Sequence, residues 1–179
     1  MRSDFTTAYI GMGSNLGDRA GNLLAAVRCL IEADFTVKTL SNIYETEPLN
    51  IDTELDFLNM VAEVRVHDVK PTQMMARLLR IEYVLGRREK SLKKPRTIDL
   101  DLLFFGNEII NSEFLTVPHP RLHLRKFVLV PLSEIAPSFV HPQLHKDIST
   151  LLSESEDFAL VQRWNPNSQN QLSFLQSPL

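Results

Sequence analysis

The sequence predicts an α+β fold in which helices pack on an antiparallel sheet. Between residues 7 and 105 the predicted segments run strand, helix, strand, strand, helix, strand, which is the order of the ferredoxin-like split βαβ fold. The chain has 179 residues, of which 44% are hydrophobic and 23% charged, a composition typical of one globular domain with a proper core. We therefore expect a ferredoxin-like βαββαβ core whose helices cover one face of the sheet, followed by additional C-terminal helices.

The first half of the chain supplies three of these strands and one helix. Residues 7–12 are predicted to form the first strand, and residues 35–44 and 57–66 the second and third. Residues 11–18 are spaced Gly-x-Gly-x-x-x-Gly, which fits neither the dinucleotide fingerprint nor a P-loop, so they are interpreted as a turn that brings the backbone close to a ligand or another strand. Residues 20–33 have the apolar spacing of an amphipathic helix, whose buried side should carry Leu23, Leu24, Val27, Leu30 and Ile31.

The second half supplies the remaining core elements and the additions. Pro71 begins a helix that ends near residue 85, because a proline in the first helical turn loses no needed donor. The fourth strand follows at residues 98–105. Beyond it the sequence predicts a short strand or hairpin at residues 108–115 and helices at 124–135 and 148–153. Because the chain is polar and helix-poor from Asn165 onward, we expect a single domain over residues 1–164 and a mobile tail over 165–179.

Two carboxylates stand in the fourth strand. Asp99 and Asp101 are one residue apart in an otherwise apolar run, so an extended chain points both to one face and Leu100 to the other. Two like charges on one face need a compensating cation, and Mg²⁺ prefers such hard oxygen ligands together with phosphates. The alternative is an edge strand whose polar face meets water.

A cluster of basic residues precedes the carboxylates. Residues 77–96 hold eight of the 19 Lys and Arg residues, although the whole chain has a formal charge of −3. Arginine and lysine next to two aspartates suit a metal-bridged polyphosphate, and the alternative is a solvated helix face followed by a charged loop. The isoelectric point near 5.9, together with the absence of finger spacing, argues against nucleic-acid binding.

Cysteine usage and the lack of long apolar segments indicate the cellular compartment of the protein. The single cysteine, Cys29, excludes internal disulfides and is interpreted as a buried core residue, which favours a cytoplasmic protein. We find no secretory signal at the start, and no apolar run approaches the roughly 20 residues of a membrane span.

Two pairs of histidines have a spacing that can bind zinc. His119 and His123 are four residues apart, as are His141 and His145. Proline follows the first member of each pair, which disfavours a helix there and argues against zinc. His119 is better placed to donate a hydrogen bond to phosphate, and the alternative is a surface-loop histidine.

Several short motifs occur in order at residues 13–17, 44–49, 57–59, 81–82, 86–87, 95–101 and 115–120. In this order and spacing they resemble the 6-hydroxymethyl-7,8-dihydropterin pyrophosphokinase family over about residues 8–153. The resemblance implies transfer of diphosphate from ATP to the hydroxymethyl group of the pterin, giving AMP and the pterin diphosphate on the way to folate. Most characteristic is the segment Arg-Thr-Ile-Asp-Leu-Asp at residues 96–101.

The resemblance also implies roles for individual residues in a protein that we expect to act as a monomer. Two Mg²⁺ ions would be held by Asp99 and Asp101, with Glu82 ordering nearby loops. ATP would contact Arg87, Arg96, Leu102, Thr116, His119 and Arg125, and the first two would clamp the diphosphate. The pterin would contact Thr46, Pro48, Leu49, Phe57, Asn59 and Phe127.

Departures from the family pattern concern closure over ATP. The segment between Arg87 and Arg96 is one residue shorter than in a family member and lacks the tryptophan found there. Pro120 stands where a family member has a tyrosine. We expect residues 50–54 and 87–94 to close over the substrates. Two other functions stay open, a non-catalytic ferredoxin-like ligand-binding module and a metal-dependent phosphohydrolase.

Overall fold

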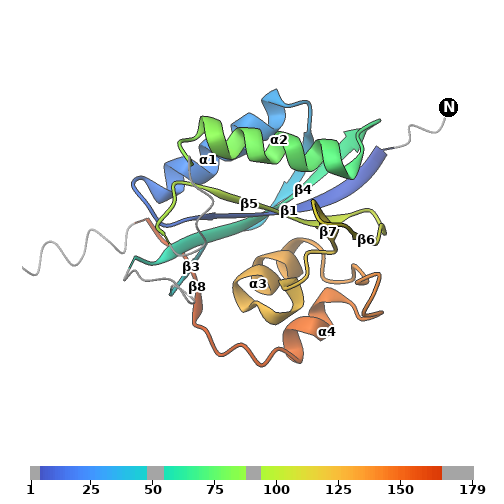
Figure 1. Ribbon diagram of the computed structural model, residues 1–179. Helices are drawn as coiled ribbons and strands as arrows, with labels where there is room; N and C mark the ends of the chain where they lie inside the picture. Colours follow the sequence, from blue (N-terminus) through green and yellow to red (C-terminus); the bar gives the residue numbers. More distant parts are fainter. Residues whose placement is uncertain (1–4, 48–54, 88–93, 167–179) are drawn as a thin grey trace, which may run out of the picture.

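The computed structural model describes residues 5–47, 55–87 and 94–166. These residues form a mixed α/β structure around an antiparallel sheet (Figure 1). The strands of this sheet are β1 (Phe5–Ser14), β2 (Thr36–Leu40), β3 (Tyr44–Thr46), β4 (Phe57–His67), β5 (Asp99–Phe105) and β8 (Val161–Arg163). β1 lies between β4 and β5, while β4 also pairs with β2 and β3, and β8 pairs with β3 at the edge.

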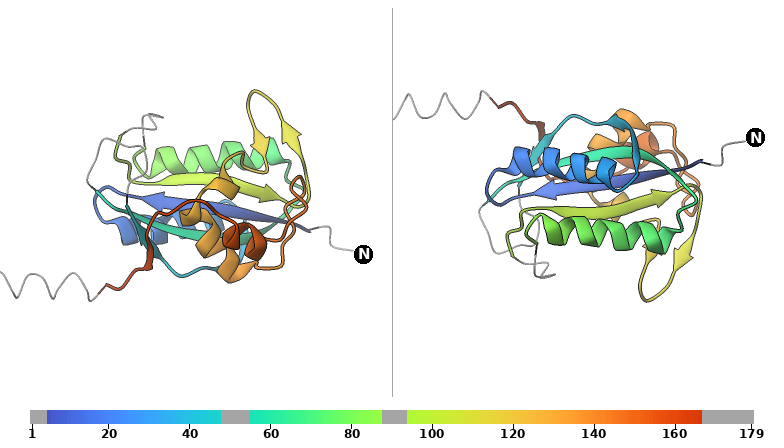
Figure 2. Two further views of the ribbon diagram at one scale, coloured as in Figure 1. Left: turned by 90° about the horizontal axis from the view of Figure 1, so that it is seen from below. Right: turned by 90° about the horizontal axis from the view of Figure 1, so that it is seen from above.

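Helices cover both faces of the sheet (Figures 1 and 2). On one face lie α1 (Arg19–Glu32) and α2 (Pro71–Val84), and on the other lie the 3₁₀ helix η1 (Leu122–Leu124), α3 (Lys126–Ile135) and α4 (Ile148–Ser153). Each layer buries its own apolar cluster, the second one around Phe104 and Leu129. The expectation that helices cover one face therefore holds for α1 and α2, and the C-terminal helices cover the other face.

The buried side of α1 is narrower than its sequence predicts. Asp18 caps the helix by accepting a hydrogen bond from the Gly21 N–H at 3.0 Å. The prediction that Leu24 and Ile31 are buried is wrong, because 60% of the Leu24 surface and 56% of the Ile31 surface are exposed. Only the line of Leu23, Ala26 and Leu30 is buried, with Val27 and Cys29 partly buried beside it. The small Ala26 brings α1 close to the sheet, and residues about 100° around the helix then face solvent.

The expected second strand is interrupted. Leu40 pairs with Ala62 and Tyr44 pairs with Asn59, so residues 41–43 stand opposite only residues 60–61 of β4. The extra residue forms a bulge that separates β2 from β3. Ser41 fixes it, since its N–H donates to the Val61 carbonyl and its Oγ accepts from the Val61 N–H, both at 2.9 Å.

The C-terminal elements agree with the expectations except for one strand. The expected hairpin is a small sheet of β6 (Ile110–Asn111) and β7 (Thr116–Val117), whose second strand lies just beyond the predicted residues 108–115, and the last two helices lie where they were predicted. The sequence did not predict β8. None of the described helices is long and apolar enough to cross a membrane. Pro48, Leu49, residues 50–54 and 88–93, and the tail from residue 167 lie outside the described residues.

Candidate active site

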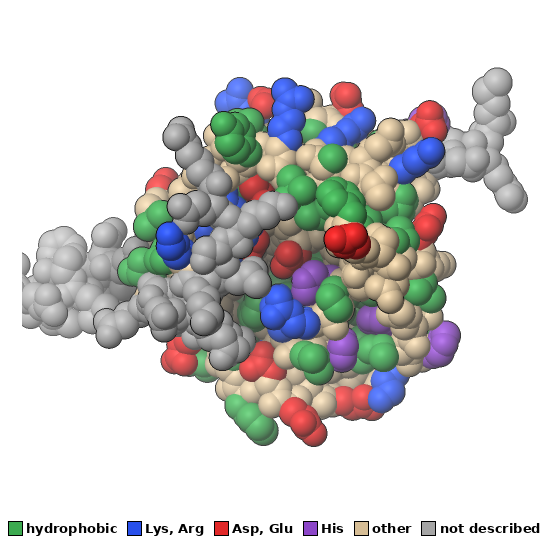
Figure 3. Space-filling model, viewed as in Figure 1, with side chains coloured by type: hydrophobic (Ala, Val, Ile, Leu, Met, Phe, Trp, Pro, Cys, Tyr) green, Lys and Arg blue, Asp and Glu red, His purple; other side chains and the backbone are tan. Residues whose placement is uncertain are grey.

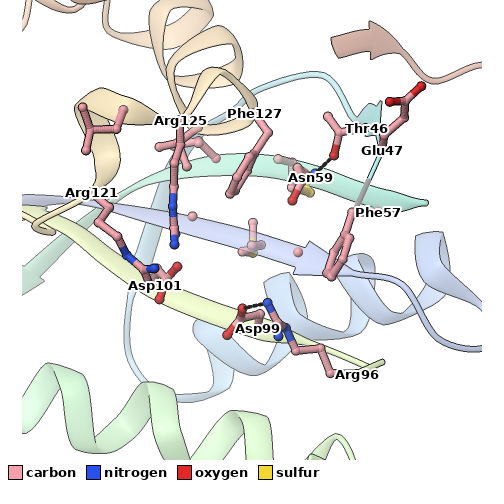
Figure 4. A pocket seen from close by; sticks show the side chains of 17 residues that line it. Thr46, Glu47, Phe57, Asn59, Arg96, Asp99, Asp101, Arg121, Arg125 and Phe127 are labelled. Carbon is pink, nitrogen blue, oxygen red and sulfur yellow. Dashed lines mark hydrogen bonds and ion pairs between the residues drawn. The ribbon is translucent and has the colours of Figure 1, made fainter. Parts of the chain in front are cut away.

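A cavity of about 300 Å³ lies at one end of the sheet, on the face that α3 covers (Figure 4). Acidic, basic and histidine side chains gather between the two helix layers on this side of the molecule (Figure 3). The strands β1, β3, β4 and β5 and the segment from η1 to α3 all contribute residues. The cavity is lined by Gly11, Met12, Gly13, Thr46, Glu47, Phe57, Asn59, Met60, Val61, Arg96, Asp99, Asp101, Arg121, Leu124, Arg125, Phe127 and Val128.

The two aspartates of β5 share the cavity. Asp99 and Asp101 both line it, while Leu100 between them is buried in the core below α1 and α2, as strand alternation predicts. Burial and the neighbouring Asp99 charge raise the pKa of Asp101 to about 6. A divalent cation would relieve this repulsion, and the oxygen-only donors fit a hard ion such as Mg²⁺.

Two arginines hold Asp99 in place. Arg96 Nη2 lies 2.7 Å from Asp99 Oδ2, and Arg87 Nη1 bonds both Asp99 Oδ1 and Glu82 Oε1. Burial alone would lower the pKa of Arg87, but the charges of Asp99 and Glu82 raise it above its usual value. Two guanidinium groups and two carboxyl groups therefore form one connected cluster.

Two buried polar residues support this cluster from behind. Glu82 is 5% exposed and accepts a hydrogen bond from the Leu100 N–H at 2.8 Å. Burial raises the pKa of Glu82 to about 7, although the Leu100 N–H and Arg87 act in the opposite direction. Asn15 exchanges two bonds with the Arg96 backbone, since Oδ1 accepts from the Arg96 N–H at 2.8 Å and its own N–H donates to the Arg96 carbonyl at 3.1 Å.

A second group of basic side chains faces Asp101. Arg121 and Arg125 both point toward Asp101 from the η1 and α3 side (Figure 4). His119 Nε2 lies 3.9 Å from Asp101 Oδ2, and its Nδ1 accepts a hydrogen bond from the Arg121 N–H at 3.2 Å. Burial, Arg125 and Arg121 lower the pKa of His119 to about 4. The neutral ring therefore carries its proton on Nε2, where it can donate to an oxygen in the cavity.

The other half of the cavity is aromatic. Phe57 and Phe127 project into it from two sides, with Asn59 between them (Figure 4). Asn59 Nδ2 donates to Thr46 Oγ1 at 2.7 Å, which fixes the amide orientation. This half can hold a flat heterocycle by ring stacking and bind its edge through polar groups.

Arginines also join the two halves of the cavity. The Arg96 guanidinium carbon lies 5.2 Å from the Phe57 ring centre, and that of Arg125 lies 5.5 Å from the Phe127 ring centre. The cations that face the carboxylates therefore also contact the aromatic rings. The arrangement can hold a metal-bound anion directly beside a stacked heterocycle.

Most of the expected site residues that the structure describes lie in or beside the cavity, but Leu102 and Thr116 do not. The Leu102 side chain is buried in the core on the α1 and α2 side, and Thr116 lies in β7 without lining the cavity. Among the described residues, no group of three or more His, Cys, Asp or Glu could hold a metal ion.

The residues in or behind the cavity that sequence reasoning missed include Gly13, Asn15, Glu47 and Arg121. The expected glycine turn is partly wrong, since Gly11 and Gly13 belong to β1. Gly13 pairs with Asn59 on one side and with Asp99 on the other. Of the two expected roles of these glycines, close approach to another strand is therefore the one that the strand pairing supports. For Arg121 the only signal was its position two residues after His119.

Comparisons with known proteins agree with one another. The family model 7,8-dihydro-6-hydroxymethylpterin-pyrophosphokinase matches residues 9–137. The 2-amino-4-hydroxy-6-hydroxymethyldihydropteridine pyrophosphokinase of Bacillus subtilis is 40% identical over 162 residues, covering 90% of this chain and 92% of that protein. The enzyme of the same name from Haemophilus influenzae is 38% identical over 161 residues, covering 89% and 99%.

A solved structure shares the fold. The Plasmodium falciparum HPPK-DHPS crystal structure with SDX-DHP aligns with a TM-score of 0.70 at 16% identity, over 84% of this chain. The present chain spans only 44% of that Plasmodium chain. At this identity the likeness establishes a common fold.

Proposed function

The chain belongs to the 7,8-dihydro-6-hydroxymethylpterin-pyrophosphokinase family, and we propose that it transfers diphosphate from ATP to 6-hydroxymethyl-7,8-dihydropterin in folate biosynthesis. One observation carries the proposal beyond the family match. One cavity holds both a charged group and an aromatic group. The charged group is Asp99, Asp101, Arg96 and Arg125, and the aromatic group is Phe57 and Phe127 with Asn59. A phosphate site and a heterocycle site are therefore adjacent, as transfer between the two substrates requires.

Asp99 and Asp101 would hold the Mg²⁺, which we propose as two ions. When bound, Mg²⁺ would neutralise charge on the ATP phosphates. The donor set supports this assignment, because both side chains offer only oxygen, and because burial together with the charge of Asp99 raises the pKa of Asp101 to about 6.

The reaction forms one P–O bond and breaks one, and the proton of the pterin hydroxyl group is released to water. The hydroxymethyl oxygen of the pterin bonds to the β-phosphorus of ATP, and the bond between that phosphorus and the α–β bridging oxygen breaks, releasing AMP. Arg87 and Arg96 would bind the diphosphate as its charge shifts, while His119 and Arg125 would contact ATP. Catalysis would then consist of positioning and charge stabilisation, without a covalent enzyme intermediate.

Phe57 and Phe127 would stack on the pterin, and Asn59 and Thr46 would bind its polar edge. The hydrogen bond between Asn59 Nδ2 and Thr46 Oγ1 leaves the Asn59 carbonyl oxygen as an acceptor for a ring N–H. Pro48 and Leu49 keep their expected pterin contacts as part of the proposal, as Leu102 and Thr116 keep theirs to ATP.

We also propose that the core corresponds to the ferredoxin-like βαββαβ order. In this assignment β2 and β3 together make up the second strand, interrupted by the bulge at residues 41–43. The sheet order of β5, β1, β4 and then β2 or β3 supports this correspondence.

The decisive experiment incubates the protein with ATP, Mg²⁺ and 6-hydroxymethyl-7,8-dihydropterin and separates the nucleotides. We expect AMP and pterin diphosphate in equal amounts, and no AMP when the pterin is omitted. Nucleotide breakdown without pterin would instead identify a phosphohydrolase. Binding of both substrates without any product would identify a non-catalytic module, and ADP as product would overturn diphosphate transfer.

A further inference from the structure

We propose that Arg121 binds the phosphate chain of ATP, as a further substrate-binding residue beside Arg125. The inference rests on the proposed function, because it concerns the same cavity. Arg121 lies between β7 and η1, outside the residues expected from the sequence, and its side chain lines the cavity and points toward Asp101 (Figure 4).

The charges in the cavity are unevenly distributed. On the Asp99 side, Arg87 bonds Asp99 and Glu82, and Arg96 bonds Asp99, so both guanidinium groups already have carboxyl partners. On the Asp101 side, Arg121 and Arg125 face that single carboxylate. A surplus of positive charge therefore lies where a polyanion could enter.

Two guanidinium groups gather on this side. Arg121 and Arg125 both line the cavity and point toward the same carboxylate, Asp101 (Figure 4). The pKa of Arg125 is lowered by burial and then by Arg121, which places the two guanidinium groups close enough to repel each other. An anion between them would remove this repulsion.

Arg121 also has no competing partner among the described residues. Its guanidinium forms no hydrogen bond, ion pair or ring contact there, whereas Arg96 and Arg125 stack on Phe57 and Phe127. Arg121 is an exposed residue that lines the cavity, so its guanidinium is available to a ligand at little cost in broken contacts.

The backbone of the turn holds Arg121 in position. Its N–H donates to His119 Nδ1 at 3.2 Å, and its carbonyl accepts from the Leu124 N–H at 3.2 Å. The Leu122 N–H also donates to the His119 carbonyl at 3.1 Å. The guanidinium therefore extends from an ordered turn, which limits the entropy lost on binding.

The test compares Arg121→Gln with Arg80→Gln. Arg80 is an exposed residue of α2 on the opposite face of the sheet, so its variant makes the same charge change away from the cavity. The probe is α,β-methylene-ATP with Mg²⁺, whose bond at the transfer position cannot break. Calorimetry measures the Kd of this probe and, separately, the Kd of 6-hydroxymethyl-7,8-dihydropterin.

We expect Arg121→Gln to raise the Kd of the probe about tenfold to a hundredfold, the usual range for one charged hydrogen bond. The Kd of the pterin should not change, because Arg121 contacts neither aromatic ring. Arg121→Lys should recover part of the affinity, and Arg80→Gln should bind both ligands like the wild type. The difference between Arg121→Gln and wild type should shrink as salt concentration rises.

Failure of this inference and failure of the proposed function give different results. If wild type forms AMP but Arg121→Gln binds the probe as Arg80→Gln does, Arg121 has no phosphate contact and the diphosphate transfer stands. If Arg121→Gln weakens both ligands equally, its role is structural and the inference is wrong. If binding depends on Arg121 but the wild type forms no AMP, the inference stands and diphosphate transfer is wrong.

Discussion

Asp99 and Asp101 have the same side chain in one cavity but different partners. Asp99 bonds two arginines, whereas Asp101 lies beside the neutral His119 ring, whose Nε2 is 3.9 Å from Asp101 Oδ2. A substitution at Asp99 therefore disturbs structure as well as metal binding. Asp101 offers the cleaner test of the metal site.

We expect Asp101→Asn to lower the rate of AMP formation by about three orders of magnitude or more at saturating Mg²⁺. The free energy of unfolding should stay the same or rise, because burial and Asp99 oppose the charged form of Asp101. AMP assays and urea unfolding measure the two effects, with Asp34→Asn in the turn after α1 as control. Near-normal turnover in Asp101→Asn would refute its role as a metal ligand.

Gly13 is predicted to shape the pterin site through its lack of a side chain. A Cβ at this position would lie 2.9 Å from Asn59 Oδ1, whereas a Cβ at Gly11 would meet only the Leu103 side chain at 3.4 Å. Gly13→Ala should therefore displace the Asn59 amide and raise the Kd of the pterin about tenfold, the loss of one good hydrogen bond. Gly11→Ala, measured by the same calorimetry, should change this Kd much less. Equal Kd values for both variants would contradict the prediction.

His141 is predicted to make the fold sensitive to acid. It is 3% exposed, contacts the Phe104 ring edge-on, and its Nδ1 accepts from the Gln143 and Leu144 N–H groups. Burial lowers the pKa of His141 to about 4, so between pH 6.5 and pH 4 the unfolded chain binds more protons than the folded one. Stability is therefore lost as the pH falls through this window.

The variant His141→Asn keeps an acceptor for the two N–H groups but cannot titrate. Between pH 7 and pH 4.5 it should lose roughly 2 kcal/mol less stability than the wild type does. Urea unfolding at a series of pH values measures the difference. Parallel curves for the two proteins would show that His141 does not contribute.

At the scale of elements, Glu134 of α3 ties the helix layer to the sheet edge. Its carboxylate accepts from the Asn42 N–H at 2.9 Å, from the Asn42 side chain and from the Tyr44 hydroxyl at 3.0 Å. Arg163 of β8 donates to Asn42 Oδ1 at 2.6 Å. Glu134 of α3 therefore holds the bulge between β2 and β3 directly, and the edge strand β8 joins them through Asn42.

Glu134→Ala should lower the free energy of unfolding by about 1–2 kcal/mol, because three donors lose their acceptor at a partly solvated site. Arg163→Ala should cost less, since it leaves the three bonds of Glu134 intact. Chemical denaturation measured by circular dichroism compares the two. A larger loss for Arg163→Ala would place the main contribution in β8 instead of Glu134.

The same elements show where sequence patterns succeed and where they stop. The alternation of β5 predicted the shared face of Asp99 and Asp101 because strand geometry alone determines it. The break at Ser41 and the short strand β8 depend on pairing with residues far along the chain, Val61 and Tyr44, and no local pattern encodes them. Arg121 was missed for the same reason, because only the fold brings it to Asp101.

At the scale of the whole molecule, the cavity joins elements that are distant in sequence. β5 brings the carboxylates, β4 brings Phe57 and Asn59, and α3 brings Phe127 from the opposite layer. Although the formal net charge of the chain is −3, arginines gather around this cavity. A polyanion and a flat ring therefore meet the same set of side chains, which couples their binding.

We expect the two substrates to bind with positive cooperativity. Arg96 and Arg125 stack on Phe57 and Phe127, so phosphate that fixes the guanidinium groups also fixes the rings on which the pterin would stack. The first ligand then bears part of the ordering cost of the second. With α,β-methylene-ATP and Mg²⁺ present, the Kd of the pterin should fall about tenfold, and the reverse experiment should give the same factor.

Chelation of Mg²⁺ by EDTA should abolish this coupling, because metal-free phosphate would face Asp99 and Asp101 directly. Calorimetric titration of pterin into the free protein, the protein with nucleotide and Mg²⁺, and the protein with nucleotide and EDTA measures all three states. Arg125→Lys is the matched variant, since lysine keeps the charge but loses the planar contact with the Phe127 ring. It should bind nucleotide almost normally and show weaker coupling. A pterin Kd that is unchanged by nucleotide in the wild type would mean that the two halves of the cavity act independently.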